Sequence, residues 1–327
     1  MSRATRIGLV LLMLSPAATY PRTVSADKHS RPAPFLTCPA EVEVVAGCGF
    51  VVAAEAIDVD PTRPISGNAK VGLRGLTTTT GRTSDGRFII TVSGCVPVDT
   101  PAGSAAISWN VTQEHHDSRS TTSIRIVRPI PSKGLPGAVE RFVQHRYIHG
   151  MPERAARQLG PNAIPILCRM LRDPKHHSSW EQIVEAIGII GTYQSFDTLT
   201  DFIWNRFHSK VDSSTLNSLL SAQATMGHAA AARPEVLKYL ARSSDGEAWA
   251  QLPWNSGKRS LIGALCALSV NSVGAIPSSQ ARNFLLSVQR ERPGLAGNAK
   301  EALEYQNLII RLGRDEAFRA FAYPGLK

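Results

Sequence analysis

The segment from residue 160 to residue 207 constrains the fold of this chain most strongly. It contains a helical stretch, a polar turn and a second helical stretch, and Gly191 then separates these from a third. One such unit cannot bury its own apolar face, so it needs similar units stacked on either side. The sequence therefore predicts an array of stacked α-helices around this segment.

A recurring spacing of small residues supports this prediction. In each copy, one residue is followed five positions later by a small residue that ends a helix. The copies are Ala155–Gly160, Ala186–Gly191, Ala222–Gly227, Ala264–Ser269 and a degenerate fifth, Leu308–Gly313. The intervals between their end positions are 31, 36, 42 and 44 residues, which is the range of helical-hairpin solenoids. Alanine permits close helix approach, and glycine favours a left-handed helix end.

Two stretches of this region carry a family resemblance. Residues 155–167 (AARQLGPNAIPIL) and 180–191 (WEQIVEAIGIIG) resemble HEAT-type repeats. The resemblance implies that residues 138–327 form a HEAT-like α-solenoid that presents a curved surface to a protein partner. A minority of such arrays are enzymes, among them bilin lyases and certain DNA-base glycosylases.

The residues before the helical region have a different pattern. Between residues 38 and 130, short β-rich runs alternate with Gly, Pro, Asp and Thr. The runs are 41–45, 50–57, 70–74, 87–92, 106–112 and 122–127. This spacing predicts an antiparallel β-sandwich over residues 38–130, with Trp109 in its core. A Pro- and Gly-rich linker at 131–137 then leads into the helices.

Three short motifs in the β-rich region carry a second resemblance. They are Cys38-Pro39-Ala40-Glu41-Val42, Ala46-Gly47-Cys48-Gly49 and Pro101-Ala102-Gly103. Together they are similar to the hyalin-repeat and cadherin-like branch of immunoglobulin-type sandwiches. That resemblance implies an extracellular adhesion or spacer module.

The N-terminus has the pattern of a secretory signal peptide. Arg3 and Arg6 precede an apolar run at residues 7–14, and Val24-Ser25-Ala26 predicts cleavage before Asp27. The alternative is an uncleaved membrane anchor, for which the apolar run is short. A flexible lead-in is expected at 27–37, and no later segment is apolar enough over a sufficient length to span a membrane. We therefore expect a secreted, periplasmic or cell-envelope protein.

The positive charge of the chain lies mainly in its helical half. The whole sequence has a net charge of +10, and residues 132–327 contribute 23 basic and 16 acidic side chains without a run of Lys or Arg. Such a weak positive field favours acidic partners, so an acidic glycan or an anionic surface is an alternative to a protein partner. Nucleic acid is not expected as a partner of an exported protein.

Three of the five cysteines lie in the β-rich region. A straight strand at 41–45 would place Cys38 and Cys48 ~30 Å apart, too far for a disulfide. Cys95 is therefore expected to pair with one of them, with Cys48 preferred. The alternative is three buried thiols.

Two sets of residues are candidate metal ligands. Asp58 and Asp60 resemble the calcium-binding loops of cadherin-like modules, with Glu55 and Asp85 as more distant candidates and a solvated turn as the alternative. His145 and His149 are spaced i, i+4 on a helix expected over residues 139–149, with His176 or His177 as a third ligand. The alternative there is a solvent-facing basic helix.

A candidate binding surface lies in an insertion at residues 243–257. Trp249, Trp254 and Asn255 stand in this loop, where aromatic side chains often mark contact surfaces. The alternative is that the tryptophans cap the helical core. The sequence contains neither a Gly-x-Ser-x-Gly elbow nor a phosphate-binding glycine loop, so no catalytic residue is assigned.

These observations favour an exported, non-enzymatic protein that mediates protein–protein interaction, scaffolding or adhesion through its helical-repeat surface. One alternative is an envelope enzyme, a hydrolase or lyase with a site in the solenoid groove that uses His145, His149 and Cys168. The other is polyanion binding by the basic helical half.

Overall fold

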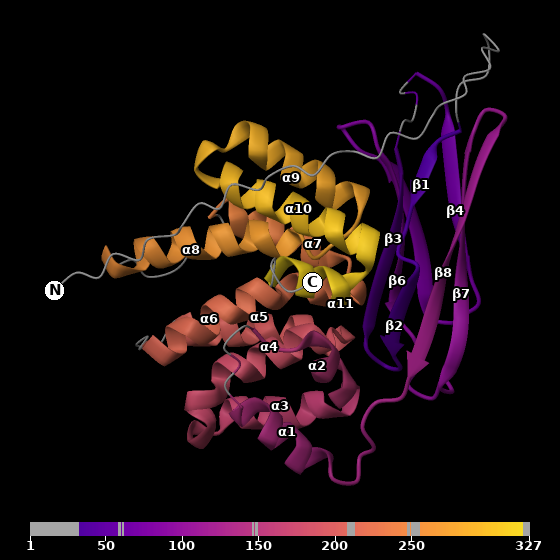
Figure 1. The fold of residues 1–327 in the computed structure, drawn as a ribbon. Helices are drawn as coiled ribbons and strands as arrows, with labels where there is room; N and C mark the ends of the chain where they lie inside the picture. The colour runs from indigo at the N-terminus through magenta and orange to yellow at the C-terminus, as the bar shows by residue number, and fades with distance from the viewer. Residues whose placement is uncertain are drawn as a thin grey trace, which may run out of the picture. The chain divides into compact units, whose positions relative to one another are not determined.

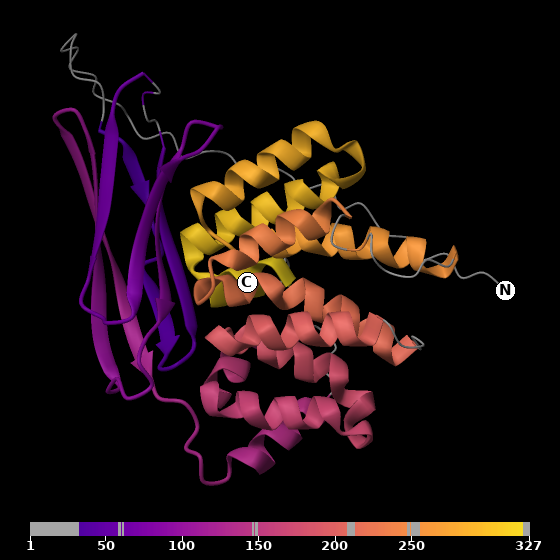
Figure 2. The same ribbon diagram turned by 180° about the vertical axis from the view of Figure 1, so that it is seen from behind.

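The computed structural model describes residues 33–322, except 58–59, 61, 146, 148–149, 208–212, 247–248 and 250–255. The expected signal peptide, at residues 1–26, lies outside the described residues. Within them, a β-sheet region precedes a helical region, and Figures 1 and 2 show the two from opposite sides.

The β region contains two four-stranded sheets. The first has the order β1 (Phe35–Thr37), β3 (Gly49–Ile57), β6 (Phe88–Cys95) and β5 (Leu76–Arg82). The second has the order β2 (Glu41–Val45), β8 (His116–Val127), β7 (Gly103–Gln113) and β4 (Ile65–Val71). Neighbouring strands are antiparallel except β2 and β8, which are parallel.

A single hydrophobic core lies between the two sheets. Large side chains fill it from both sides, among them Phe50, Phe88, Ile90, Trp109 and Ile124. The buried Trp109 indole donates from Nε1 to Thr122 Oγ1 at 2.8 Å, which satisfies its polar group inside the core. The sequence prediction of Trp109 as a core residue is confirmed.

Two strands were not expected from the sequence. Phe35–Thr37, placed in the flexible lead-in, is the strand β1 and pairs with the end of β3. Leu76–Arg82 is the edge strand β5, and its four consecutive threonines have the β-branched shape that strands favour. Neither run has the apolar alternation by which half-buried strands are recognised.

The helical region begins at Leu135. Its α-helices are α1 (Leu135–Gln144), α2 (Glu153–Leu159), α3 (Ile164–Arg172), α4 (Trp180–Ile190), α5 (Tyr193–Phe207), α6 (Ser213–Thr225), α7 (Glu235–Ser244), α8 (Ser256–Val273), α9 (Ser279–Glu291), α10 (Ala296–Leu312) and α11 (Arg314–Ala322). Short 3₁₀ turns, including η2 (Pro174–Ser179) and η3 (Met226–Ala231), connect several of them. In the described part of the chain, no helix is both long enough and apolar enough to span a membrane.

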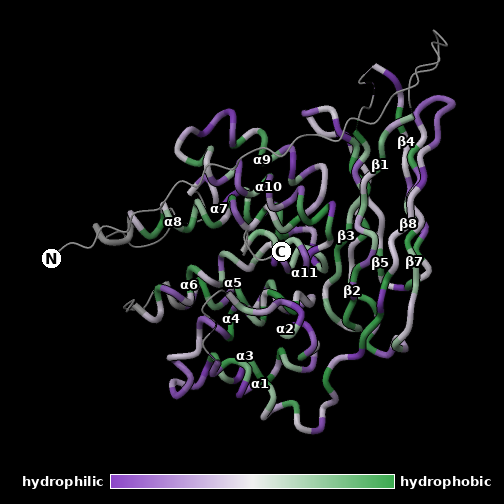
Figure 3. Tube along the Cα trace, viewed as in Figure 1, coloured by the Kyte–Doolittle hydropathy of each residue, from purple (hydrophilic) through white to green (hydrophobic). Residues whose placement is uncertain are grey.

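The pattern predicted for residues 160–207 is confirmed. Helix α3, the polar turn η2 and helix α4 follow one another, and Gly191 ends α4 in the left-handed conformation (φ 62°, ψ 37°) before α5. A large apolar core unites these helices with their neighbours. Hydrophobic residues gather along β3 and inside the helical region, whereas the tip of the β7–β8 hairpin is hydrophilic (Figure 3).

The outer face of the first sheet is covered by the helical region. Along β3, alternate residues such as Phe50 point into the core between the sheets, and the residues between them face the helices. Ala53 and Ile89 pack against Ile310 of α10, and Thr91 Oγ1 donates to the carbonyl oxygen of Pro277 at 2.7 Å. Both faces of β3 are therefore buried.

Two ion pairs join the sheets to the helices. Asp85, in the β5–β6 hairpin, accepts a bidentate pair of hydrogen bonds from the buried Arg282 of α9, with Nη2 at 2.7 Å from Oδ2. Glu43 of β2 accepts a bidentate pair from Arg154 of α2, at 3.0 and 2.8 Å. These directional contacts, together with the apolar packing, fix how the sheets meet the helices.

Gly49 is the closest approach of β3 to the helices. A Cβ atom at this position would lie 2.2 Å from the carbonyl oxygen of Gly191, so Gly49→Ala should displace backbone and lower the free energy of unfolding by ~1–3 kcal/mol. The matched control is Gly72→Ala, where a Cβ would meet nothing within 4 Å. Urea unfolding of the two variants measures the difference, and equal stability would contradict this close contact.

Candidate binding cleft between the sheets and the helices

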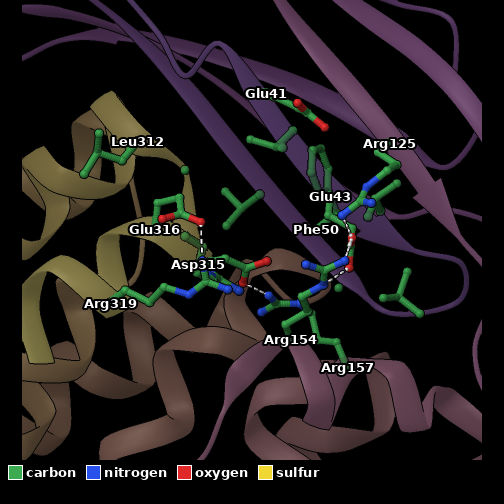
Figure 4. Close-up of a pocket in the computed structure, with 17 residues that line it drawn as sticks. Glu41, Glu43, Phe50, Arg125, Arg154, Arg157, Leu312, Asp315, Glu316 and Arg319 are labelled. Atoms are coloured by element: carbon green, nitrogen blue, oxygen red, sulfur yellow. Dashed lines mark hydrogen bonds and ion pairs between the residues drawn. The ribbon is translucent and has the colours of Figure 1, made fainter. Parts of the chain in front are cut away.

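A cleft of about 300 Å³ lies where β2 and β3 face α2 and α11. We call it the junction cleft, and Figure 4 shows the side chains that line it. One wall is formed by residues 41–45 and 49–51 with Arg125, and the other by residues 312–316 with Arg154, Arg157 and Arg319. A second hollow of about 230 Å³ adjoins it and shares Arg154, Asp315 and Arg319. Charged side chains therefore dominate the opening.

At the mouth of the junction cleft, two arginines share one carboxylate. Glu43 and Arg125 are cross-strand partners on β2 and β8, and the Arg125 guanidinium pairs with Glu43 Oε2. Arg154 binds the same carboxylate from the opposite wall (Figure 4). The Glu43 side chain is 8% exposed, whereas those of Arg125 and Arg154 are 50% and 42% exposed. This group of three carries a surplus of one positive charge toward solvent.

Deeper in the cleft, Arg157 is held by two carboxylates. Its Nη1 donates to Glu153 Oε2 at 3.1 Å, one helical turn away on α2, and its Nη2 pairs with Asp315 at the start of α11. The backbone carbonyl of Arg157 also accepts from the Cys48 thiol at 3.4 Å. Arg157 thus ties the turn before β3 to helices α2 and α11.

Glu153 and His228 form the buried end of this network. His228 Nε2, on η3, lies 3.8 Å from Glu153 Oε1. Burial lowers the pKa of His228 to about 4, although the Glu153 charge opposes this shift. Burial alone would raise the pKa of Glu153, but the charges of His228, Arg157 and Arg314 outweigh it, so that the pKa lies below its usual range. At neutral pH the histidine is neutral and the carboxylate ionised.

These protonation states limit the acid–base chemistry of the buried residues behind the cleft. A general acid or base works best when its pKa lies near the operating pH, and neither Glu153 nor His228 meets that condition. The network instead supplies fixed charges and fixed hydrogen-bond donors. Such an arrangement is suited to holding a ligand in one orientation.

Of the three sequence-predicted binding residues, the structure describes Trp249, which does not line the junction cleft. The Trp249 side chain is 0% exposed, donates from Nε1 to the carbonyl oxygen of Ser243 at 2.9 Å and packs against Trp204. Its burial in the helical core matches the alternative reading, in which the tryptophan caps that core. Trp254 and Asn255 lie outside the described residues.

The helix expected over residues 139–149 is shorter in the structure. Helix α1 ends at Gln144, and His145 has an extended backbone. The Tyr147 hydroxyl donates to the carbonyl oxygen of Phe142 at 3.1 Å, and its ring packs against those of Phe142 and His145, which turns the chain away from the helix axis. His145 is exposed at this turn, beyond the end of the helix. His149 lies outside the described residues, so a metal site at His145 and His149 stays a prediction.

The acidic residues considered for calcium take part in other contacts. Asp60 Oδ1 accepts from the backbone and hydroxyl of Thr62, and Oδ2 lies 3.3 Å from Arg63 Nε. Glu55 binds Arg87, Asp85 binds Arg282, and Asp58 lies outside the described residues. Among the side chains that the structure places, no three His, Cys, Asp or Glu gather as a metal-ligand set.

All five cysteines are thiols in the structure. Cys38 Sγ lies 3.1 Å from Ser120 Oγ, while Cys48 is buried against Arg157. Gly49, the neighbour of Cys48, is the strand partner of Cys95, so the preferred pair lies at the same end of β3 and β6. Burial raises the pKa of Cys48 to about 12 and also raises that of Cys95. The Cys48–Cys95 disulfide stays a prediction.

The cleft residues themselves were missed from the sequence. They come from four separate segments of the chain, with Glu43 on β2, Arg125 on β8, Arg154 on α2 and Asp315 on α11. The alternation Glu41-Val42-Glu43-Val44 indicates a charged outer face on β2. No local motif indicates that a second wall stands opposite that face.

Comparison with known proteins identifies no family. No family model matches the chain, and no curated protein matches it. A solved structure described as the GspB Siglec domain is 19% identical over 42% of this chain and 77% of its own, with a TM-score of 0.26. A family 123 glycoside hydrolase from Clostridium perfringens is 11% identical over 38% of this chain and 31% of its own, with a TM-score of 0.22.

Arg157→Leu tests whether the deep network holds the cleft together. It would leave Asp315 without this partner and Glu153 with Arg314 as its remaining permanent positive charge, and we expect it to lower the free energy of unfolding by ~3–5 kcal/mol. The matched control is Arg319→Leu, which removes an exposed pair with Glu316 and should cost ~1 kcal/mol or less. Denaturant unfolding measures both, and similar losses would contradict the proposed difference.

The depressed pKa of His228 predicts a pH dependence of stability. Below pH 6.5 the unfolded chain binds a proton at this residue, whereas the folded protein does so only near pH 4. Protonation therefore favours unfolding, and the free energy of unfolding should fall by on the order of 2 kcal/mol between pH 7 and pH 5 from this group.

His228→Gln removes the titrating group and should flatten that part of the curve. His115→Gln is the matched control, because the His115 side chain is exposed in the folded protein. Thermal or urea unfolding at several pH values measures the slope. An unchanged slope in His228→Gln would show that other groups control stability in this window.

Proposed function

We propose that this chain is an exported, non-enzymatic protein that binds a partner protein in the junction cleft. One observation carries the proposal: a charged cleft lies at a junction whose two sides are fixed to each other. Binding sites occur preferentially where two structural regions meet, and a rigid site loses little entropy when it is occupied.

The arrangement of the elements supports a more specific architecture. The strand order β1-β3-β6-β5 against β8-β7-β4 corresponds to the A-B-E-D and G-F-C sheets of an immunoglobulin-type sandwich, with β2 added beside the last strand. We propose that the helices form a HEAT-like solenoid. The recurring glycines Gly191 and Gly227 support this, because a Cβ at each would lie within 3.0 Å of the backbone of a later turn or helix.

The protonation states of the two buried residues behind the cleft do not suit them to acid–base catalysis. Glu153 and His228 both have a pKa below its usual range, so neither exchanges a proton readily at neutral pH. Groups of this kind can orient a ligand through fixed charges and hydrogen bonds. The export proposal depends on the N-terminal sequence alone: the arginines, the apolar run and Val24-Ser25-Ala26.

Arg154→Glu tests the proposed binding site. It turns the surplus positive charge at the mouth into a negative one, so we expect retention of a partner from an envelope or secreted extract to fall by about tenfold or more. The bait is the chain from Asp27 onward, and bound proteins are quantified by mass spectrometry.

Arg290→Glu is the matched control. Arg290 is also an exposed, ion-paired arginine, but it lies on α9 and does not line the junction cleft. It should retain the same partner as the wild-type chain. If Arg154→Glu retains the partner fully, or both variants lose it equally, the junction cleft is not the binding site.

A further inference from the structure

The free edge of β2 opens into the junction cleft. Among the strands that the structure describes, β2 is the end strand of its sheet and pairs with β8 alone. Ser123 N–H donates to the carbonyl oxygen of Ala40 at 2.9 Å, and Ala46 N–H donates to that of Val127 at 3.0 Å. The backbone N–H and C=O groups of the even-numbered residues of β2 therefore point toward β8. Backbone N–H and C=O groups alternate in direction along a strand, so those of Glu43 point away from β8, toward the free edge of the sheet.

The backbone of Glu43 offers a donor and an acceptor on that side. No described residue forms a hydrogen bond with the backbone N–H or C=O of Glu43 in the structure. The carbonyl oxygen of Val45, the next odd-numbered residue, accepts from Cys48 N–H at 3.1 Å. An incoming peptide can thus pair with the edge at Glu43, as in strand addition.

The cleft is short along β2. At one end, a Cβ on Gly313 would lie 2.9 Å from Val42 Cγ1 and 3.8 Å from the carbonyl oxygen of Glu41, so the α10–α11 turn closes it. At the other end, the turn from Val45 to Cys48 packs against Arg157. A volume of about 300 Å³ is at the small end of ligand sites. It suits the end of a chain better than a segment that passes through.

The charge at the mouth indicates which end of a chain would fit. Arg125 and Arg154 both bind Glu43 and still carry a surplus of one positive charge. Each guanidinium has five N–H donors, more than one shared carboxylate uses. A second carboxylate would neutralise the surplus positive charge of Arg125, Arg154 and Glu43. It can also form charge-assisted hydrogen bonds with both arginines.

We propose that the junction cleft binds the C-terminal residues of the partner protein. The terminal carboxylate lies between Arg125 and Arg154, and the backbone of the last residues pairs with the β2 edge at Glu43. This inference rests on the proposed function, because it names the part of the partner that occupies the same cleft.

Dye-labelled synthetic peptides test the proposal. A library of random hexapeptides with free C-terminal carboxylates is selected on the chain from Asp27 onward, and the enriched peptides are remade as C-terminal amides. We expect enriched free acids to bind in fluorescence anisotropy and their amides to bind about tenfold or more weakly. Failure to enrich any peptide, or equal binding of acid and amide, would overturn the inference.

Two substitutions at Glu43 separate charge from backbone pairing. Glu43→Gln keeps the N–H and frees both arginines for the ligand carboxylate, so peptide affinity should increase. Glu43→Pro also loses the carboxylate but removes the N–H on the free edge, where proline is tolerated, and affinity should fall. Equal affinities of the two variants would contradict strand pairing, and circular dichroism verifies that both fold.

The outcomes distinguish this inference from the function on which it rests. If Arg154→Glu abolishes partner retention but the peptides fail, the cleft is a binding site for something other than a chain end. If Arg154→Glu retains the partner fully, the proposed function fails as well. Arg290→Glu should leave peptide binding unchanged, and a loss there would indicate non-specific attraction to positive charge.

Discussion

The rest of the structure depends on the burial of both faces of β3. Large side chains such as Phe50 and Val52 fill the space between the sheets, whereas Gly49 and Ala53 face the helices. Small residues on that outer face let the helices approach almost to backbone contact, which a larger side chain would prevent. The helical region thus completes a core that the sheets alone would leave exposed, and the position of the junction cleft follows from this contact.

The ion pairs around this contact have a different role from the apolar packing. A buried or half-buried pair adds little net stability, because its attraction mainly offsets the desolvation of its two charges. It is directional, however, and Asp85–Arg282 and Glu43–Arg154 hold separate strands to separate helices. The apolar contact brings the two regions together, and the pairs select one relative placement. A cleft whose walls are held in this way is organised before a ligand arrives.

The sequence predicted the individual helices and strands better than the way they pack against one another. The helix–turn–helix pattern around Gly191 was recognisable because its apolar periodicity is local. The run of β3, which is apolar apart from Glu55, indicated burial on both faces, because a strand with one solvent-exposed face alternates between apolar and polar residues. β5 was missed because its Thr-rich run has no such alternation. The cleft was missed because Glu43, Arg154 and Asp315 meet only through the fold.

The division of charge within the cleft decides where a ligand can gain affinity. Arg157 is already held by Glu153 and Asp315, so a ligand that reached it would compete with two carboxylates in a buried site. Arg125 and Arg154 share one carboxylate and are half exposed, so they can bind a second carboxylate without breaking a buried ion pair. Salt weakens attraction at such exposed groups, and charge alone would bind many anions. In the proposed complex, selectivity therefore comes from the backbone edge at Glu43, which would pair with a peptide backbone and not merely with a negative charge.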